Sequence, residues 1–472
     1  MTVTKPSLTF IVLAAGKGTR MKSVLPKVLH PVAGRPMIEK VISSAKKAGA
    51  NEVRVVVGHG QNLVRQVVEP MGVATFVQEN QLGTADAVRS AKPEELTGEV
   101  VIMNGDHPLI QPQDLTQMLK EFREMKSDLA VVTVKVKKPS EFGRIVRHRG
   151  ELVAIVEAKD ASSETLKINE VNTGIYLVKA KILAEYLPQI QNKNSKQEFY
   201  LTDLVSLCIE NRHLVHAIQS HVRVSVGVNN QAELSRATNY IFRTKARQLL
   251  EDGVIIIDPK TVYIEESVQI SAGSVIYPNV FLRGDTQIGS YTVIESNCFI
   301  SDTIIGDSCQ IKAGSYIEKT HISHKVHVGP YARLRPETVI GEEAHIGNFV
   351  ELKKVQFGKK SKASHLTYLG DAEIGEEVNI GCGTITCNYA ADKKKYKTKI
   401  GDRVFVGSDT QFIAPIEIGD DAVIGSGSTI TKSVPAKALA VARGRQMIKE
   451  NYMPKSPSQI DEKIKSKEIK GN

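Results

Sequence analysis

The sequence predicts an α/β Rossmann-like domain, then a connecting α-helix, then a left-handed parallel β-helix. Three observations support this architecture. Apolar strand-like runs alternate with amphipathic stretches over residues 1–230, helical periodicity covers residues 231–252, and large apolar residues recur every six positions from Ile264 onward. A chain of 472 residues has room for two or three domains at roughly 150 residues each.

The first 230 residues have the pattern of a mostly parallel sheet covered by helices, and we assign them to one domain. We expect strands at Leu8–Ala15, Glu52–Val57, Val100–Met103 and Val222–Val226, and helices at Pro36–Ala48, Thr84–Ala91 and Pro112–Met125.

Residues 231–252 predict a long helix that links the two domains. Leu234, Ala237, Ile241 and Leu249 give helical periodicity, charged residues fill the positions between them, and Gly253 is a natural stop.

From residue 253 the sequence has the six-residue period of a parallel β-helix. Each unit would form one side of a triangular coil with its apolar residue pointing inward, and we assign residues 253–452 to this domain. The polar, Lys-rich and Ser-rich tail at 453–472 is predicted to be disordered. The repeating positions, in runs separated by slips or breaks, are Ile264, Ile270, Ile276, Leu282, Ile288, Ile294 and Ile300; Ile305, Ile311 and Ile317; Ile322, Val328, Leu334, Ile340, Ile346 and Leu352; Ile374 and Ile380; and Ile400, Val406, Phe412, Ile418, Ile424 and Ile430.

The composition narrows the class of protein. Lys and Arg number 62 against 52 Asp and Glu, a mild excess that suits phosphorylated small molecules, and no basic block typical of a nucleic-acid-binding tail is present. The five cysteines form no disulfide framework, which indicates a reducing compartment. Neither a signal peptide nor an apolar run of ~18 residues occurs, so we expect a cytoplasmic protein without a membrane span.

A glycine-rich turn follows the first predicted strand. Leu8–Ala15 continues into Gly16-Lys17-Gly18-Thr19-Arg20-Met21, with Lys27 a few residues downstream. Backbone N–H groups in such a turn can approach phosphates. The run lacks the Walker A spacing, and Met21 stands where the dinucleotide fingerprint needs a third glycine. Taken with Lys27, it resembles the nucleotidyltransferases that make nucleoside-diphosphate sugars.

This resemblance implies a UTP and UDP-sugar site. Arg20 and Lys27 would neutralise triphosphate charge, and Asp106 with Asn229 would hold one Mg²⁺. Asp106 follows the predicted strand Val100–Met103, and a ligand carboxylate is typical of that end of an α/β sheet. Asn104 stands where the family often has an aromatic residue. The positions that match the family's nucleotide and sugar contacts are Leu13, Ala14, Ala15, Gly16, Lys27, Gln78, Gly83, Thr84, Asn104, Gly105, Asp106, Gly143, Glu157, Asn172 and Asn229.

A second candidate site surrounds His365. The runs His365–Asp371 and Thr386–Tyr389 interrupt the six-residue phase, and breaks in a solenoid often mark its binding face. Arg335 and Lys353 lie upstream and are cations suited to a sugar phosphate.

Over residues 7–450 the chain resembles the bacterial bifunctional enzymes that combine N-acetylglucosamine-1-phosphate uridyltransferase with glucosamine-1-phosphate N-acetyltransferase. The resemblance implies that His365 is a general base and that Glu351 orients or polarises it. It places sugar phosphate on Arg335, Lys353, Tyr368 and Asn379, and acetyl-coenzyme A on Cys382, Asn388, Tyr389, Ser408, Ser426 and Arg443. Cys382 stands where the family often has Ala, and Gly-Arg follows Arg443 in place of Val-Pro. The family also implies a homotrimer, with small-molecule partners only.

Several alternatives stay open. A nucleotidyltransferase with one activity could carry a regulatory β-helix, and an assembly protein of the initiation-factor exchange type could carry degenerate sites. His321, His324 and His327, spaced three apart, could bind a metal, although a surface or trimer contact suits them better. The loop Lys393–Lys399 could meet coenzyme A phosphates, or it could be a solvated run of charge.

Overall fold

A computed structural model describes residues 6–194, 196–450 and 452 of the chain. The predicted disordered tail, 453–472, lies outside the described residues. The chain forms two compact units, residues 1–287 and the residues from Ile288 onward. The first unit therefore includes the first coils of the β-helix. The predicted functional boundaries at 230/231 and 252/253 stay predictions.

A mixed sheet with the order β11-β7-β10-β6-β1-β4-β5 forms the centre of the first unit. Strands β1, β4, β5 and β6 run parallel, as the sequence predicts, and β11 runs parallel to β7. Strand β10 is antiparallel to both β6 and β7, and β8 pairs with β9 and β10 off the main path. The strands are β1 (Leu8–Ala14), β4 (Glu52–Val57), β5 (Ala74–Val77), β6 (Glu99–Asn104), β7 (Leu129–Lys135), β8 (Arg144–His148), β9 (Glu151–Val156), β10 (Glu170–Lys179) and β11 (Val215–Gln219).

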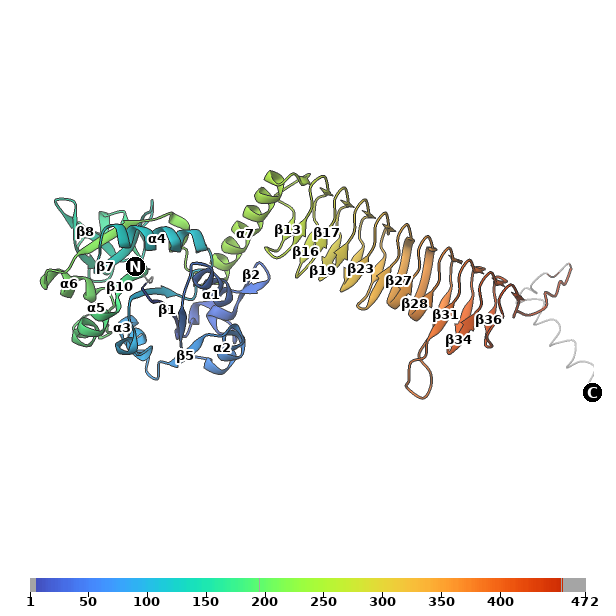
Figure 1. Cartoon of the computed structure of the whole chain (residues 1–472), viewed down its shortest axis with the longest axis horizontal. Coiled ribbons are helices and arrows are strands. Elements are labelled where there is room, and N and C mark those ends of the chain that lie inside the picture. Colours follow the sequence, from blue (N-terminus) through green and yellow to red (C-terminus); the bar gives the residue numbers. More distant parts are fainter. Residues whose placement is uncertain (1–5, 195, 451, 453–472) are drawn as a thin grey trace, which may run out of the picture. The chain divides into compact units, whose positions relative to one another are not determined.

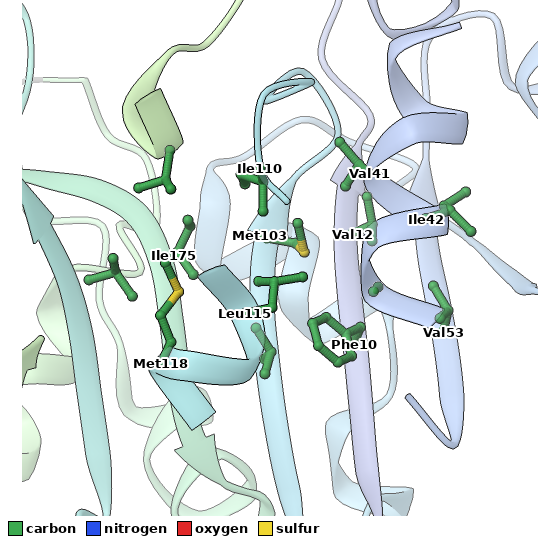
Figure 2. Packing of buried hydrophobic residues seen from close by; sticks show 14 of the residues in the cluster. Phe10, Val12, Val41, Ile42, Val53, Met103, Ile110, Leu115, Met118 and Ile175 are labelled. Atoms are coloured by element: carbon green, nitrogen blue, oxygen red, sulfur yellow. The ribbon is translucent and has the colours of Figure 1, made fainter. Parts of the chain in front are cut away.

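The helices cover both faces of this sheet because its strands are apolar on both sides. On one face Phe10, Val12 and Met103 pack against residues of α1 and α4, such as Val41 and Leu115 (Figure 2). On the second face, residues of α3, α5 and α6 pack against the sheet in a separate hydrophobic cluster. The helices are α1 (Met37–Lys47), α2 (Gln61–Val68), α3 (Thr84–Ser90), α4 (Pro112–Glu124), α5 (Ala180–Tyr186), α6 (Asp203–Glu210) and α7 (Gln231–Glu251), and β2 (Pro31–Val32) pairs with β3 (Arg35–Pro36) in a short hairpin.

The predicted strand at Val222–Val226 is wrong. Val222–Ser225 forms a 3₁₀ turn, and the ring of His221 caps it by accepting the backbone N–H of Arg223. The alternation of valines has the period of a strand, but a local side-chain cap fixes the turn instead. The helix α7 follows, capped by Asn230, and the chain leaves it through Gly253 at φ +89°.

The six-residue period builds the β-helix as predicted. Every repeating apolar residue named from the sequence is buried, from Ile264 to Ile430. Successive coils stack in parallel register, visible from β19 to β36 in Figure 1. The strands are β12 (Ile255–Ile256), β13 (Tyr263–Ile264), β14 (Gln269–Ile270), β15 (Val275–Ile276), β16 (Phe281–Arg283), β17 (Gln287–Ile288), β18 (Val293–Ile294), β19 (Phe299–Ser301), β20 (Ile304–Ile305), β21 (Gln310–Ile311), β22 (Tyr316–Glu318), β23 (Thr320–Ile322), β24 (His327–Val328), β25 (Arg333–Leu334), β26 (Thr338–Ile340), β27 (His345–Phe357), β28 (Lys362–Ile374), β29 (Asn379–Ile380), β30 (Ile385–Cys387), β31 (Thr398–Ile400), β32 (Phe405–Val406), β33 (Gln411–Ile413), β34 (Ile416–Ile418), β35 (Val423–Ile424), β36 (Thr429–Ile430) and β37 (Leu439–Ala440).

One of the two predicted breaks in the repeat is not a break in the structure. The run His365–Asp371 lies inside β28, which pairs with β27 from one end to the other. Ala363 and Leu369 continue the inward positions there, and both are fully buried. The phase is hidden in the sequence because one inward residue is a small alanine and the inward positions advance by seventeen residues from β27 to β28, as Ile346 to Ala363 shows, so the six-residue spacing slips by one. The second break is real, since the chain between β30 and β31 projects as a loop (Figure 1).

Candidate active sites

A cavity of about 290 Å³ opens at the carboxyl end of β1 and β6. Ligands bind at this edge of α/β sheets because successive loops diverge there. Ten of the residues predicted to bind the nucleotide line the cavity: Leu13, Ala14, Ala15, Gly16, Lys27, Gln78, Gly83, Thr84, Asn104 and Asp106. Gly105, an eleventh residue of the predicted set, lies directly behind this lining. Its N–H donates to the carbonyl of Leu13 at 2.8 Å.

Lys27 joins the two predicted metal ligands. Its Nζ donates to Asp106 and lies 3.1 Å from Asn229 Oδ1. The backbone reinforces this contact, because the N–H of Val228 donates to the carbonyl of Asp106 at 3.0 Å. The structure therefore brings together three residues that lie up to 202 positions apart in the sequence.

The oxygen atoms of this cluster suit a hard divalent cation. Burial acts to raise the pKa of Asp106, but the charges of Lys27 and His107 and the hydrogen bond from Lys27 outweigh it, so the pKa lies below its usual range. Asp106 is therefore an anion at neutral pH. Its Oδ1 atom is buried and has no hydrogen-bond partner among the described residues. One carboxylate and one amide oxygen are the ligands that Mg²⁺ commonly takes from a protein beside phosphates.

Arg20 lies beside the same cluster. Its guanidinium donates to Asn229 Oδ1 at 3.1 Å and pairs with Glu141 Oε2 at 3.4 Å. Gly18 has φ +60°, and a Cβ at that position would lie 2.6 Å from Cβ of Lys27. The glycine therefore lets the loop fold close over Lys27.

The predicted sugar contacts form a second cluster. The N–H of Asn172 donates to the carbonyl of Gly143 at 2.9 Å, and a Cβ on Gly143 would lie 3.4 Å from Glu157 Oε1. Burial raises the pKa of Glu157. Asn104 lies against Gly174, which has φ +77°, and a Cβ at Gly174 would lie 2.7 Å from Asn104 Nδ2. Gly143, Glu157 and Asn172 are thus together, although they do not line the cavity described above.

Another part of the cavity lining comes from the segment 78–84. Gln78 Nε2 donates to the carbonyl of Gly83 at 3.1 Å and to Asp86 Oδ2 at 2.7 Å. Thr84 Oγ1 accepts the backbone N–H of Leu201 at 3.0 Å. Gln81 also lines the cavity and belongs to the run Gln81–Ala85, which resembles the family's uracil and sugar contacts. The structure adds Val28, Ala87 and Glu198 to the lining, and Glu198 comes from a distant loop without a motif.

In the β-helix, the predicted sugar-phosphate residues lie on adjacent coils. Glu351 and Tyr368 are in register on β27 and β28, and Lys353 is in register with Gly370. Arg335 donates to Glu351 Oε1 at 2.9 Å. Asn388 is buried and donates to Asp371 beside Tyr368 and Gly370. This arrangement puts Arg335, Lys353 and Tyr368 on one side of the coil.

His365 is exposed at the neighbouring edge, in register with Asn348. Among the described residues no hydrogen bond joins it to Glu351, whose carboxylate pairs with Arg335 instead. The orienting role of Glu351 therefore stays a prediction. Asn379 lies on the strand β29, in register with Lys362 of β28, and is also exposed.

Four of the six residues predicted for acetyl-coenzyme A, Cys382, Ser408, Ser426 and Arg443, follow this edge from coil to coil, whereas Asn388 pairs with Asp371 and Tyr389 lies on the projecting loop. The N–H of Gly383 donates to the carbonyl of Leu366, that of Asp409 to Cys382, and that of Gly427 to Ser408. Arg443 donates to the carbonyl of Ser426 at 2.9 Å. Cys382, Ser408, Ser426 and Arg443 are exposed, as is Tyr389 on the projecting loop. The edge thus forms a polar track that leads away from His365.

Lys395 of the projecting loop lies close to Lys353 of this site. The nearby ammonium group of Lys395 is the main reason that the pKa of Lys353 is lowered, and partial desolvation and the charge of Arg335 add to it. Two other lysines of this run are ion-paired, Lys397 with Glu373 and Lys399 with Glu417 at 3.4 Å. Three cations, Arg335, Lys353 and Lys395, therefore converge on one region.

The described residues hold no group of three or more His, Cys, Asp or Glu side chains able to bind a metal ion. This leaves the His321, His324 and His327 alternative without support, since His324 contacts Asp307 and His327 contacts Gln310. Among the helices that the structure describes, none is both long and apolar enough to cross a membrane.

Comparison with known proteins matches both halves of the chain. A family model described as a MobA-like NTP transferase domain matches residues 10–190, one described as a GMPPB C-terminal domain matches residues 259–365, and six bacterial transferase hexapeptide repeats match residues 397–432. A solved structure, titled a putative glucose-1-phosphate thymidylyltransferase from Bacillus anthracis in complex with a sucrose, covers 49% of this chain and 94% of its own, with 21% identity and a TM-score of 0.40.

Curated relatives match over nearly the whole length. The bifunctional protein GlmU of Bdellovibrio bacteriovorus is 73% identical over 449 residues, which is 95% of this chain and 98% of the relative. The chain belongs to the bifunctional GlmU family. GlmU proteins of Pelobacter propionicus and Carboxydothermus hydrogenoformans are each 46% identical over 94% of this chain. As a GlmU protein the chain is a transferase with two activities, a nucleotidyltransferase domain followed by a hexapeptide acyltransferase domain. The alternatives with one activity or none are therefore wrong.

Proposed function

We propose that this chain makes UDP-N-acetylglucosamine in two steps, one at each of its two sites. The β-helix transfers the acetyl group of acetyl-coenzyme A to the amine of glucosamine 1-phosphate. The N-terminal domain then transfers uridylyl from UTP to the phosphate of that product. The nucleotide substrate follows from membership of the GlmU family.

In the acetyl step the sugar nitrogen attacks the thioester carbonyl. The new C–N bond forms, the C–S bond breaks, and the sulfur of coenzyme A leaves with the bonding electrons and takes up one proton to become the thiol. The attacking amine must lose a proton, and His365 accepts it at a ring nitrogen. Its exposed position at the coil edge leaves that ring accessible to a sugar held by the adjacent side.

The binding residues divide between the side and the edge of the coil. Arg335 and Lys353 hold the sugar phosphate by charge and hydrogen bonds, and Tyr368 and Asn379 position the ring. Asn388, Tyr389 and the polar track of Cys382, Ser408, Ser426 and Arg443 carry the coenzyme. The track begins next to His365, which suits delivery of the thioester to the base.

In the uridylyl step an oxygen of the sugar phosphate attacks the α-phosphorus of UTP, and pyrophosphate leaves with the electrons of the broken P–O bond. Arg20 and Lys27 neutralise the triphosphate, and the amides of the Gly16 loop approach it. Asp106 and Asn229 would hold Mg²⁺, which when bound offsets charge on the phosphates. Gln78, Gly83 and Thr84 line the uracil side, and Gly143, Glu157 and Asn172 hold the sugar.

The acetyl site favours assembly as a homotrimer. His365, Cys382 and Tyr389 lie on an exposed surface of the single chain, and neighbouring copies would cover it. We place the enzyme in the cytoplasm, where its product supplies peptidoglycan and lipopolysaccharide synthesis.

The contact of Lys27 with both Asp106 and Asn229 at the cavity carries the uridylyl half of this proposal. An omission experiment tests the whole. The full chain with glucosamine 1-phosphate, acetyl-coenzyme A, UTP and Mg²⁺ should form UDP-N-acetylglucosamine. Omission of acetyl-coenzyme A should stop the reaction, and N-acetylglucosamine 1-phosphate should restore it. A UDP-sugar product formed from glucosamine 1-phosphate without the coenzyme would contradict the proposed order.

A further inference from the structure

The buried histidine next to Asp106 has no part in the chemistry above. We propose that His107 is a positioning residue, which holds the segment that carries Asn229 against the loop that carries Asp106 and so sets the spacing of the two cation ligands. The inference rests on the proposed function, in which Asp106 and Asn229 hold the divalent cation.

His107 reaches from one ligand segment to the other. It follows Asp106 directly in the turn after β6, and only 6% of its surface is exposed. Its Nδ1 lies 3.1 Å from the carbonyl oxygen of Val224. A carbonyl oxygen can only accept, so Nδ1 is the donor. Val224 belongs to the 3₁₀ turn Val222–Ser225, five residues before Asn229.

The backbone supplies two further contacts between the same segments. The N–H of Val228 donates to the carbonyl of Asp106 at 3.0 Å. Gly227 packs against the His107 ring, since a Cβ at Gly227 would lie 3.0 Å from Nε2. The segment 224–228 is therefore fastened near both ends, and His107 fills the space between its backbone and the β6 loop.

This arrangement also keeps one oxygen of Asp106 available. His107 directs its Nδ1 donor to Val224, and its Nε2 atom lies 3.6 Å from Asp106 Oδ1, beyond ordinary hydrogen-bond length. Asp106 Oδ1 stays without a hydrogen-bond partner among the described residues. Residues that orient metal ligands typically change metal affinity or activity by roughly 10–100-fold when they are replaced.

The test compares three variants of the full-length chain. His107→Leu removes the donor and fills most of the volume, and His107→Asn keeps an N–H donor at the δ position. His216→Leu is the matched control, because His216 loses a similar hydrogen bond, with Ser127 at 2.8 Å, on the edge strand β11. Binding of Mn²⁺ in the presence of UTP is followed by electron paramagnetic resonance. The Mg²⁺ concentration for half-maximal uridylyl transfer is measured beside it.

We expect His107→Leu to weaken Mn²⁺ binding and raise the half-maximal Mg²⁺ concentration by roughly 10–100-fold. His107→Asn should recover most of this loss, and His216→Leu should match wild type. Unchanged Mn²⁺ binding in His107→Leu would overturn the inference, even if the rate fell, because the loss would then be structural.

Should His107→Leu fail to fold, Gly227→Ala provides a second probe. Its Cβ presses on the His107 ring while the histidine stays in place, so we expect weaker Mn²⁺ binding in the same direction. Wild-type Mn²⁺ affinity in that variant would also overturn the inference. Absence of metal-dependent uridylyl transfer in the wild-type chain would instead overturn the proposed function.

Discussion

Lys27 Nζ lies 3.1 Å from Asn229 Oδ1 and donates a further hydrogen bond to Asp106. Lys27 comes from the segment after β1, Asp106 from the turn after β6, and Asn229 from the residues that precede α7. A single ammonium group thus connects three segments at the carboxyl end of the sheet. Removing the charge of Lys27 or of Asp106 would therefore change the charge balance at this edge of the sheet.

Asp106→Asn should lower kcat/KM for uridylyl transfer by roughly 10²-fold or more, because metal stabilisation of transition-state charge is worth several kcal/mol. The amide keeps the shape of the side chain but removes the only carboxylate among the proposed ligands. Pyrophosphate release measures the loss, and acetyl transfer by the same sample should keep its wild-type rate. Near-normal uridylyl transfer would show that the cation is held elsewhere.

The sequence predicts two members of this cluster because each follows a recognisable element, whereas the strand expected before Asn229 is a 3₁₀ turn in the structure. Asp106 ends an apolar strand run, and Lys27 lies just after a glycine-rich turn. His107 was missed because one histidine in a turn has no pattern, and its hydrogen bond to Val224 joins residues 117 positions apart. Periodicity records which face a residue occupies, but it contains no information on such distant pairs.

The β-helix was predictable because each coil repeats one local rule. Ile300, Val328 and Phe412 satisfy it, and all three are fully buried. The six-residue rule does not identify Ala363, because a small residue takes the inward position there. A continuous coil therefore looks like a break in the sequence. A different pattern fails at Val222–Val226, where a strand-like alternation forms a 3₁₀ turn capped by His221. Short-range hydrogen bonds to side chains can override a two-residue period.

Replacement of Arg20 and replacement of its exposed partner Glu141 should have very different effects on kcat for uridylyl transfer. Arg20→Ala should lower kcat for uridylyl transfer by roughly 10²–10³-fold, because it removes a positioned charge from the developing negative charge. Glu141→Gln should change kcat by less than about fivefold, since the Arg20–Glu141 ion pair is 3.4 Å long, with side chains 61% and 82% exposed.

Steady-state kinetics at saturating Mg²⁺ separates the two variants of this pair. A large loss in Glu141→Gln would mean that Glu141 holds Arg20 in a productive position. A small loss in Arg20→Ala would remove Arg20 from the phosphate site.

His365→Ala should lose acetyl transfer by a factor of roughly 10²–10⁴, the usual cost of removing a general base. The loss should appear in kcat, because Arg335 and Lys353 still hold the sugar phosphate. Thiol release measures the rate, and gel filtration of the same sample shows whether the assembly survives. His148→Ala, which replaces an exposed histidine of β8, is the control and should keep its acetyl transfer. Full activity in His365→Ala would show that another group accepts the proton.

Glu170 on β10 should make the stability of the N-terminal domain depend on pH. Arg147 donates to both of its oxygens at 2.7 and 2.8 Å, and Thr133 adds a third hydrogen bond at 2.8 Å. The hydrogen bonds from Arg147 lower the pKa of Glu170; burial opposes them, and the bond from Thr133 and the Arg147 charge add to the lowering. A lowered folded pKa gives stability that is fully present above the unfolded pKa of about 4.3 and is lost as pH falls through the folded pKa.

Glu170→Gln should therefore destabilise the domain by about 1–3 kcal/mol at pH 7, the range for hydrogen bonds to a charged group, and by less at pH 4 and below. Urea unfolding followed by circular dichroism at both pH values measures the difference. Glu210→Gln, which neutralises an exposed carboxylate of α6, should change the free energy of unfolding little at either pH. A Glu170→Gln penalty that is equal at both pH values would attribute the loss to packing, because only the ionised carboxylate gains from Arg147.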